Sequence, residues 1–452
     1  MVSQATIAQI RFGYGLGGTA PQTAADILAR LGGPDRVREK YPVVPLARAV
    51  ELARSLARAR KAEKTGKGSA RAQLKAARRE IDAAYGQGFV HALARIVETD
   101  NPFFERLTWF WADHFTATPK NASSRAAAPA YVDEAIRPHV TGRFADMLKA
   151  VVTHPFMLLY LDQASSVGPN SAVGRKRGAG LNENLARELM ELHTLGVGAP
   201  YTQDDVRQMA ELLTGLTFSP RRGFVFRPEM AEPGAEQVLG KRYGGGMPRL
   251  EQVFEALEDL ALRPETARHL CTRLATHFVA DSPDPGLVAA MEAAWRASGG
   301  DLPAVYEAML GHPASWAAPL AKVKQPFDYV ASALLALGFS GKELAALERR
   351  DIRRYLFEPL KAMGQPFMGA PGPDGWPEEA EAWITPQGLA VRIAWADAVA
   401  RQVASRVGDP RRFVRRALND AAGEDLLFAA RAAETEAEGV MLVLASAEFN
   451  SR

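Results

Sequence analysis

The sequence lacks several features that define common protein classes. It has a single cysteine, Cys271, in 452 residues, which excludes an intrachain disulfide. The first twenty residues contain no continuous apolar stretch typical of a secretory signal. No later apolar run reaches about eighteen residues, the length needed to cross a bilayer. We therefore expect a cytoplasmic protein that does not associate with a membrane.

The sequence also has few isoleucines and a small net charge. Isoleucine occurs nine times, whereas alanine, leucine and arginine recur throughout the chain. Strands thus lack a favoured residue, while good helix formers are abundant. The 55 basic and 52 acidic residues leave a net charge of only +3, so no global field attracts nucleic acid. The composition predicts a mainly α-helical globular protein.

Three segments stand out from the general helical pattern. Residues 44–87 are rich in alanine, arginine and lysine and predict a basic helical hairpin. Residues 165–181 are rich in glycine and serine, which predicts a mobile loop that could act as a lid. Residues 217–248 contain two short apolar runs, 223–226 and 237–239, separated by turn residues, and predict one β-hairpin on the helical body.

The basic hairpin raises the question of an anionic partner. Between Arg48 and Arg79 there are eleven lysines and arginines against two acidic residues. Such a segment attracts a phosphate backbone. No aromatic residues lie between the charges to stack on bases, however, which favours a solvated helix face. We do not expect nucleic acid as a partner, although a nucleic-acid accessory factor that uses this hairpin remains an alternative.

Two further segments concentrate residues that can support chemistry. The aromatic segment 101–115 has six aromatic residues in fifteen, a density typical of a core or a ligand pocket. On the predicted helix 182–195, Arg187, Glu188 and Glu191 share one face. His193 lies on the opposite flank of the leucine stripe, so it points away from Glu191 on a regular helix.

Two interpretations of this polar face remain open. Glu188 and Glu191 repel each other unless a cation lies between them, and Arg187 is the nearest candidate. The alternative is a divalent metal held by His114, Glu188 and Glu191, because facing helices can assemble carboxylate and imidazole ligands. The spacing matches neither the Glu-x-x-His motif of di-iron bundles nor the His-Glu-x-x-His motif of zinc proteases.

The same segment resembles a known family. NENLARELMELHTLGV (182–197), followed by YTQDDV (201–206) and LTG (213–215), is similar to the central signature of a large bacterial family, domain of unknown function 1800. The similarity continues in RFGYG (11–15) and in Gly375-Trp376-Pro377. It implies one mostly helical domain over 1–452 and no settled reaction. Where many members have His-Asp, this chain has Ala231-Glu232.

The leading hypothesis is a metal-assisted enzyme, catalysing an oxidation or a hydrolysis, with its site between the aromatic helix 103–115 and the helix 182–195. Glu188 and Glu191 are then metal ligands or general bases, His114 and His193 are imidazole partners, and Arg187 holds an anion or carboxylate. The substrate is an unknown small molecule, and the only cofactor suggested is a divalent metal. The alternative is a non-enzymatic scaffold that binds a protein partner, with these polar residues forming a buried network.

Overall fold

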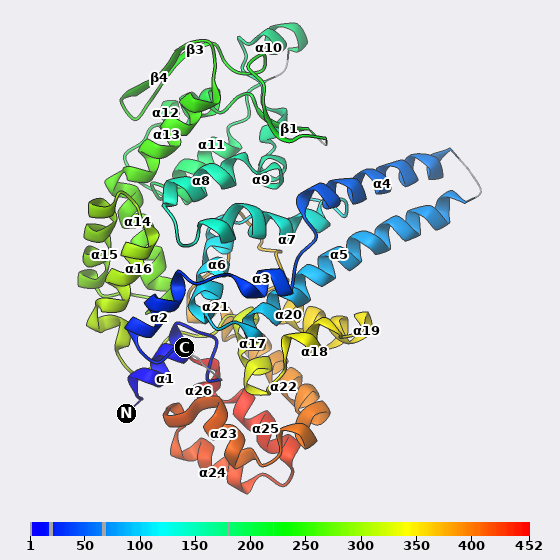
Figure 1. Cartoon of the computed structure of the whole chain (residues 1–452), viewed down its shortest axis with the longest axis vertical. Coiled ribbons are helices and arrows are strands. Elements are labelled where there is room, and N and C mark those ends of the chain that lie inside the picture. The colour runs from blue at the N-terminus through cyan, green and yellow to red at the C-terminus, as the bar shows by residue number, and fades with distance from the viewer. Residues whose placement is uncertain (1, 18–20, 66–68, 179, 220) are drawn as a thin grey trace.

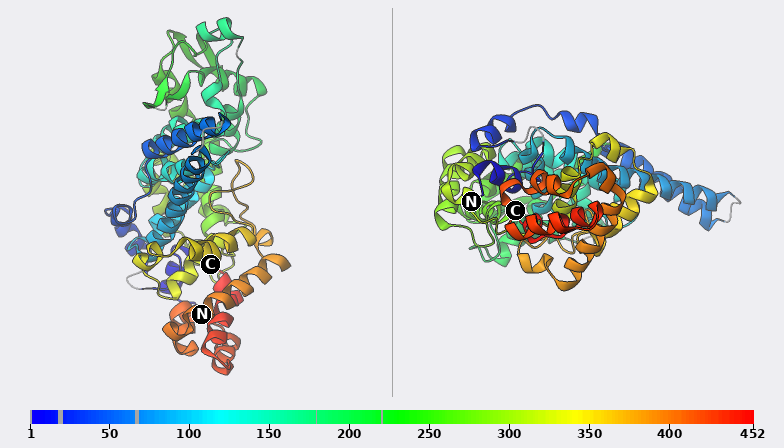
Figure 2. Two further views of the ribbon diagram at one scale, coloured as in Figure 1. Left: turned by 90° about the vertical axis from the view of Figure 1, so that its right-hand side faces the viewer. Right: turned by 90° about the horizontal axis from the view of Figure 1, so that it is seen from below.

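The computed structural model describes residues 2–17, 21–65, 69–178, 180–219 and 221–452. Most of these residues are helical, and the described strands form two small antiparallel sheets, which confirms the predicted mainly α-helical class. The molecule is elongated, with the sheets at one end of its long axis and the C-terminal helices at the other (Figures 1 and 2).

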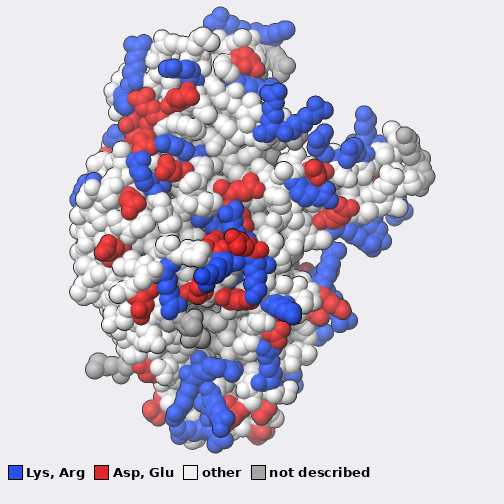
Figure 3. All heavy atoms as spheres, in the orientation of Figure 1, with Lys and Arg blue, Asp and Glu red and all other residues white. Residues whose placement is uncertain are grey.

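The N-terminal part contains a projecting helical arm. The helices here are α1 (Gln4–Arg11), α2 (Ala24–Leu31), α3 (Arg36–Lys40), α4 (Leu46–Lys64), α5 (Ala70–Glu98) and α6 (Pro102–His114). Helices α4 and α5 pack against each other and project from the body as the arm (Figure 1). Leu52, Leu56, Leu74 and Ile81 form part of a small core within the arm, separate from the main core. Lysine and arginine side chains stand out along its surface (Figure 3).

Helix α6 runs through the main core and is the aromatic helix of the sequence. The Asn101 side chain accepts a hydrogen bond from the Phe104 backbone N–H at 3.2 Å, and Pro102 occupies the first turn, so the start is well capped. Leu107 and Trp111 are fully buried. The Trp111 indole N–H donates to the Tyr306 hydroxyl at 2.7 Å. One side of α6 is therefore fixed in the core.

The middle of the chain is built from short helices. They are η1 (Arg125–Ala127), α7 (Ala128–Tyr131), η2 (Val132–Ile136), η3 (Arg137–His139), α8 (Phe144–Thr153), α9 (Pro155–Tyr160), η4 (Gln163–Ser165), α10 (Ala172–Arg177), α11 (Asn184–Glu188), η5 (Leu189–His193) and α12 (Gln203–Leu212). Helix α12 begins with a capping box between Thr202 and Asp205, as the sequence predicts. Element η5 is a π-helix, so the predicted helix 182–195 is not regular along its length.

The glycine-rich segment 165–181 contains the short helix α10. Its backbone is joined to the segment before the third strand: the Gly168 N–H donates to the Met230 carbonyl at 2.9 Å and the Val173 N–H to the Glu229 carbonyl at 3.1 Å. The segment is thus partly ordered by hydrogen bonds that its composition does not reveal. Its mobility stays a prediction.

The segment 217–248 forms two hairpins where the sequence predicts one. The strands are β1 (Leu216–Ser219), β2 (Gly223–Phe226), β3 (Gly234–Val238) and β4 (Lys241–Gly246). β1 pairs with β2, and β3 pairs with β4. Leu239 and Gly240 both have positive φ, 51° and 82°, which suits a tight two-residue hairpin turn. The sequence does not predict the pairing of β3 with β4, because β4 is polar and glycine-rich and has no alternating apolar residues.

The rest of the chain is helical. The elements are α13 (Leu250–Leu262), α14 (Pro264–Phe278), α15 (Pro285–Ser298), α16 (Leu302–Gly311), η6 (Pro313–Trp316), α17 (Pro326–Ala336), α18 (Gly341–Ala345), α19 (Arg349–Asp351), η7 (Ile352–Phe357), α20 (Glu358–Ala362), α21 (Ala380–Trp383), α22 (Pro386–Val407), α23 (Pro410–Leu418), η8 (Asn419–Ala421), α24 (Glu424–Ala432), α25 (Glu436–Ala445) and α26 (Ala447–Asn450). Helices α13 to α16 lie along one edge of the molecule (Figure 1). Within the described ranges, no helix combines the length and the apolar character that crossing a bilayer requires.

Candidate functional site

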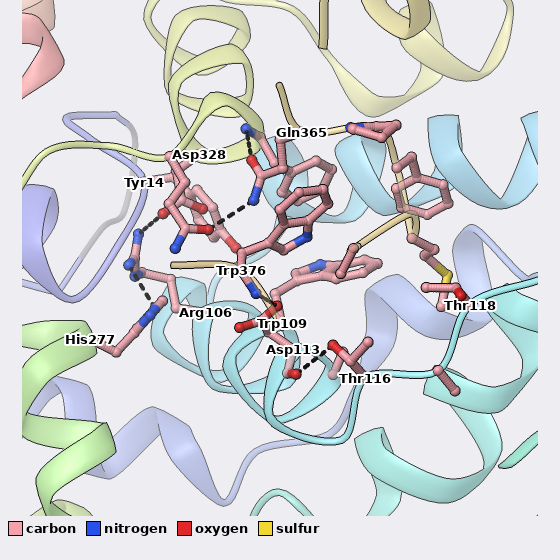
Figure 4. Close-up of a pocket in the computed structure, with 18 residues that line it drawn as sticks. Tyr14, Arg106, Trp109, Asp113, Thr116, Thr118, His277, Asp328, Gln365 and Trp376 are labelled. Carbon is pink, nitrogen blue, oxygen red and sulfur yellow. Dashed lines mark hydrogen bonds and ion pairs between the residues drawn. The ribbon is translucent and has the colours of Figure 1, made fainter. Parts of the chain in front are cut away.

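A cavity of about 770 Å³ lies on the side of α6 that faces away from the core. Its walls are largely aromatic, formed by Trp109 from α6, Phe327 from α17, and Phe367 and Trp376 from the segment between α20 and α21. Charged side chains point into the same space (Figure 4). A hollow with apolar walls and a few convergent polar groups has the usual composition of a small-molecule site.

Asp113 is the acidic group on the α6 wall of this cavity. Its carboxylate accepts a hydrogen bond from the Trp376 backbone N–H at 3.0 Å, and Arg273 lies 3.9 Å from the other carboxylate oxygen. Only 17% of the side chain is exposed. Burial raises the pKa of Asp113 to about 7, with smaller contributions from Glu378 and Asp374, while Arg273 opposes the rise. Near neutral pH this carboxyl group is present both with and without its proton.

Gly375 explains how the chain comes so close to Asp113. A Cβ atom at this position would lie 2.8 Å from the Asp113 carbonyl oxygen and within 2.9 Å of both carboxylate oxygens. The backbone of Gly375 also has φ +83°, which side-chain-bearing residues rarely adopt. The Gly375-Trp376-Pro377 motif therefore places a backbone donor against the acid.

A buried charge network closes the other end of the cavity. Arg106 donates to Asp328 at 3.1 Å and approaches His277 Nε2 at 3.3 Å. His277 Nδ1 is 2.6 Å from Glu378. Burial lowers the pKa of His277 to about 4, although Glu378 opposes this. The neutral ring therefore donates from Nδ1 to Glu378 and accepts from Arg106 at Nε2.

The charges in this network balance. Asp328 also receives a hydrogen bond from Arg452 at 2.5 Å, while Lys322 pairs with Glu378 at 3.2 Å and with Asp281 at 2.6 Å. Burial alone raises the pKa of Asp328, but Arg106 and Arg452 outweigh it and lower the pKa. The paired cations therefore favour the ionised form of Asp328 at this wall.

Tyr14 adds a buried hydroxyl group. It lines the cavity and is 1% exposed, and its hydroxyl has no hydrogen-bond partner among the described residues. Burial raises the pKa of Tyr14 well above its ordinary value, so the hydroxyl keeps its proton. An unpaired buried hydroxyl is costly, and a ligand with a polar group offers it a partner.

The predicted residues on the helix 182–195 form an ion-pair cluster. Arg187 contacts Glu191 at 3.2 Å and Glu183 at 3.3 Å. Glu188 has no ion pair in the described structure. Burial raises the pKa of Glu188, and Glu191 and Asp374 add to the effect. None of these side chains is among those that line the cavity.

The predicted imidazoles lie on the core side of α6. His114 and His193 are fully buried, and His114 Nε2 is 3.2 Å from the His193 carbonyl oxygen. Burial, followed by Arg273, lowers the pKa of His193 to about 3. In the described ranges, no three His, Cys, Asp or Glu side chains are grouped so that they could hold a metal ion. The metal assignment of His114, Glu188 and Glu191 therefore stays a prediction without a ligand cluster behind it.

Sequence reasoning missed Asp113, Arg106, His277 and Tyr14. Asp113 is next to His114, the residue predicted as a metal ligand. Adjacent residues are about 100° apart around a helix, so the two side chains face different spaces. The partner that identifies Asp113, Trp376, lies 263 residues along the chain. One signal in the sequence could have indicated this contact. The aromatic helix and the Gly375-Trp376-Pro377 motif are both among the segments that resemble the family.

Comparison with known proteins gives one result. The sequence model of the family described as "Protein of unknown function (DUF1800)" matches residues 10–451, nearly the whole chain. No curated protein and no solved structure matches the chain significantly. The match confirms the resemblance found in the sequence: the chain belongs to the DUF1800 family.

Proposed function

We propose that this protein is an enzyme that binds a small organic substrate in the aromatic cavity and transfers a proton through Asp113. The observation that supports this is the convergence of Asp113, the unpartnered Tyr14 hydroxyl and four aromatic walls on one space. Aromatic walls favour a flat, apolar substrate portion. A carboxyl group with a pKa near the working pH suits general acid–base catalysis.

Hydrolysis is the reaction class that these groups support best. Asp113 in its ionised form accepts a proton from an attacking water, and in its protonated form returns one to the leaving group. The metal-assisted oxidation or hydrolysis suggested by the sequence needs ligands that the described residues do not group together, so the proposal assigns the proton transfer to the cavity's own residues.

The binding test uses benzamide, which has a flat ring and a polar amide. We expect ligand-observed NMR to show that it binds the wild-type protein. Ala370→Trp fills the cavity, because Ala370 lines it and is 9% exposed, and should abolish binding. Ala47→Trp places the same side chain on an exposed position of α4 and should leave binding unchanged. Equal binding by all three proteins would refute the cavity as the site.

The catalytic test uses N-(4-nitrophenyl)benzamide, whose hydrolysis releases a chromophore. We expect the rate to rise as the pH passes about 7, where Asp113 loses its proton. Asp113→Asn keeps the acceptor for Trp376 but cannot take up a proton, and should lower the rate by about 10²- to 10⁴-fold. A rate that is unchanged in Asp113→Asn would contradict the proposal.

A second candidate is a non-enzymatic protein that binds a protein partner. The observation that favours it is the pairing of Arg187 with Glu183 and Glu191, which gives these charged residues partners close to them in the chain. Under this function benzamide does not bind and Asp113→Asn has no effect on any reaction. The two experiments above therefore separate the candidates.

A further inference from the structure

A second and larger hollow lies where the arm meets the body. It measures about 1210 Å³ and is bounded by α4, α9 and the segment 118–124. We call it the arm groove. Ala49, Ala53 and Ala57 form its α4 wall, and Phe156, Leu159 and Tyr160 form its α9 wall. Leu159 is 40% exposed in this hollow, which is an unusual position for a large apolar side chain on a packed body.

The groove follows from the spacing of small residues on α4. Ala49, Ala53 and Ala57 are four residues apart, so they lie one above another on a single face of the helix. Larger side chains at these positions would fill the space between the arm and α9. Ala53 and Ala57 are not part of the small core that joins α4 to α5, so they are not needed to hold the arm together.

The arm groove adjoins the aromatic cavity at Thr118. Thr118 lines both hollows, and its side chain is hydrogen-bonded to Tyr160 on the groove wall. In Figure 4, Thr118 lies at the end of the cavity opposite Arg106 and His277. The charged end of the cavity and the groove under the arm therefore lie on opposite sides of the aromatic walls and Thr118.

We propose that the substrate is an amphiphile, with its polar reacting group in the aromatic cavity and a linear hydrocarbon tail in the arm groove. This inference rests on the proposed function and specifies its substrate class. A single chain-like molecule that passes Thr118 suits the two adjoining hollows, because one has aromatic walls with charged groups and the other is lined mostly by apolar side chains. A folded partner segment would fill the groove but would not extend past Thr118.

The test measures how affinity depends on tail length. N-alkylbenzamides from methyl to octyl keep the benzamide group constant and lengthen the tail. We follow the Kd by tryptophan fluorescence and expect it to fall about fourfold for each methylene that enters the groove. This is the gain in affinity that the burial of one CH₂ group provides. Binding of 1-octanol is measured in parallel, so that the groove is tested on its own.

Matched variants locate the tail. Ala53→Trp fills the groove and should remove the dependence on tail length while leaving benzamide binding intact. Ala57→Phe is a milder variant at an exposed position and should weaken the dependence if the tryptophan variant does not fold. Ala47→Trp, also exposed on α4 but outside the groove, should change neither quantity.

The outcomes separate this inference from the proposed function. Benzamide binding with a Kd independent of tail length overturns the inference and leaves the cavity site standing. Tail-length dependence that persists in Ala53→Trp also overturns it, because the tail then lies elsewhere. Failure of benzamide to bind refutes the proposed site, whereas 1-octanol binding that Ala53→Trp abolishes still supports the groove as an apolar-chain site.

Discussion

Replacing Asp113 by asparagine should stabilise the protein, and by an amount that depends on pH. The carboxyl group has an ordinary pKa of 3.8, and burial raises it to about 7 in the folded protein. Above pH 7 the folded state must keep a charged carboxylate in a site that disfavours charge. This difference in pKa corresponds to about 4 kcal/mol, an upper value because 17% of the side chain contacts solvent and Arg273 is nearby.

The sign of the effect follows from proton binding. Between pH 3.8 and about 7 the folded state holds the proton on Asp113 more tightly than the unfolded state does. The contribution of this group to stability is therefore most favourable below pH 3.8, decreases as the pH rises, and is fully lost above about 7. Asp113→Asn removes the titration and keeps an oxygen to accept from the Trp376 N–H.

Urea unfolding followed by tryptophan fluorescence, from pH 4 to pH 9, measures this difference. We expect wild type and Asp113→Asn to have similar free energies of unfolding at pH 4, and the variant to gain several kcal/mol by pH 8. Asp100→Asn, at a side chain that is 65% exposed, is the control and should change stability by less than about 0.5 kcal/mol at every pH. A variant that is equally or less stable than wild type at both pH values would show that Asp113 has an ordinary pKa, and the catalytic role assigned to it would lose its physical basis.

Four other consequences can be measured. Arg137→Met leaves Glu105, which is 1% exposed, as an unpaired buried charge and should cost about 3–5 kcal/mol in urea unfolding. Gly375→Ala brings a methyl group within 2.9 Å of the Asp113 carboxylate at a φ of +83°, so it should cost about 1–3 kcal/mol and weaken benzamide binding; unchanged affinity would contradict the close packing. If the exposed cations of the arm attract polyanions, DNA binding should be weak, independent of sequence and lost by physiological salt, whereas tight binding at that salt would make nucleic acid a true partner. Trypsin should cleave slowly after Arg175 or Lys176 if the hydrogen bonds of the segment 165–181 keep it packed, and rapid cleavage slowed by benzamide would support a lid.

The helical class could be read from the sequence because it depends on local signals. The capping box of Thr202 and Asp205 lies within four residues, and both partners are visible in the printed chain. The same holds for Asn101 and Pro102 at the start of α6. The choice of strand partner is different: β2 pairs with β1 rather than with 237–239, and β3 pairs with β4, although the sequence does not mark either partner as a clear strand.

The site could be read only in part. The aromatic helix was identified as a possible pocket wall, and one of its sides does line the cavity. The choice of the facing helix depended on the density of polar residues in 182–195, where Arg187 and Glu191 pair within one helix. Asp113 and Trp376, by contrast, are 263 positions apart in the sequence and come together only in the folded protein. Motif density detects neighbours in sequence, and this site is made of residues that are distant in sequence.

The charge network affects how the pH dependence of binding in the cavity should be interpreted. Buried ion pairs cost desolvation energy, and an apolar wall of equal volume would stabilise the fold as well or better. Burial, helped by Arg452 and Arg106 and opposed by Glu378, nevertheless lowers the pKa of His277 to about 4, so this ring does not change charge at neutral pH. Asp113 is then the acidic side chain on the described cavity wall whose charge changes near pH 7. Lys324, which interacts with Asp328 and Arg106, also has a pKa of about 7, but it is present in both proteins. A ligand whose affinity changes across pH 7 in wild type but not in Asp113→Asn therefore responds to the proton on Asp113.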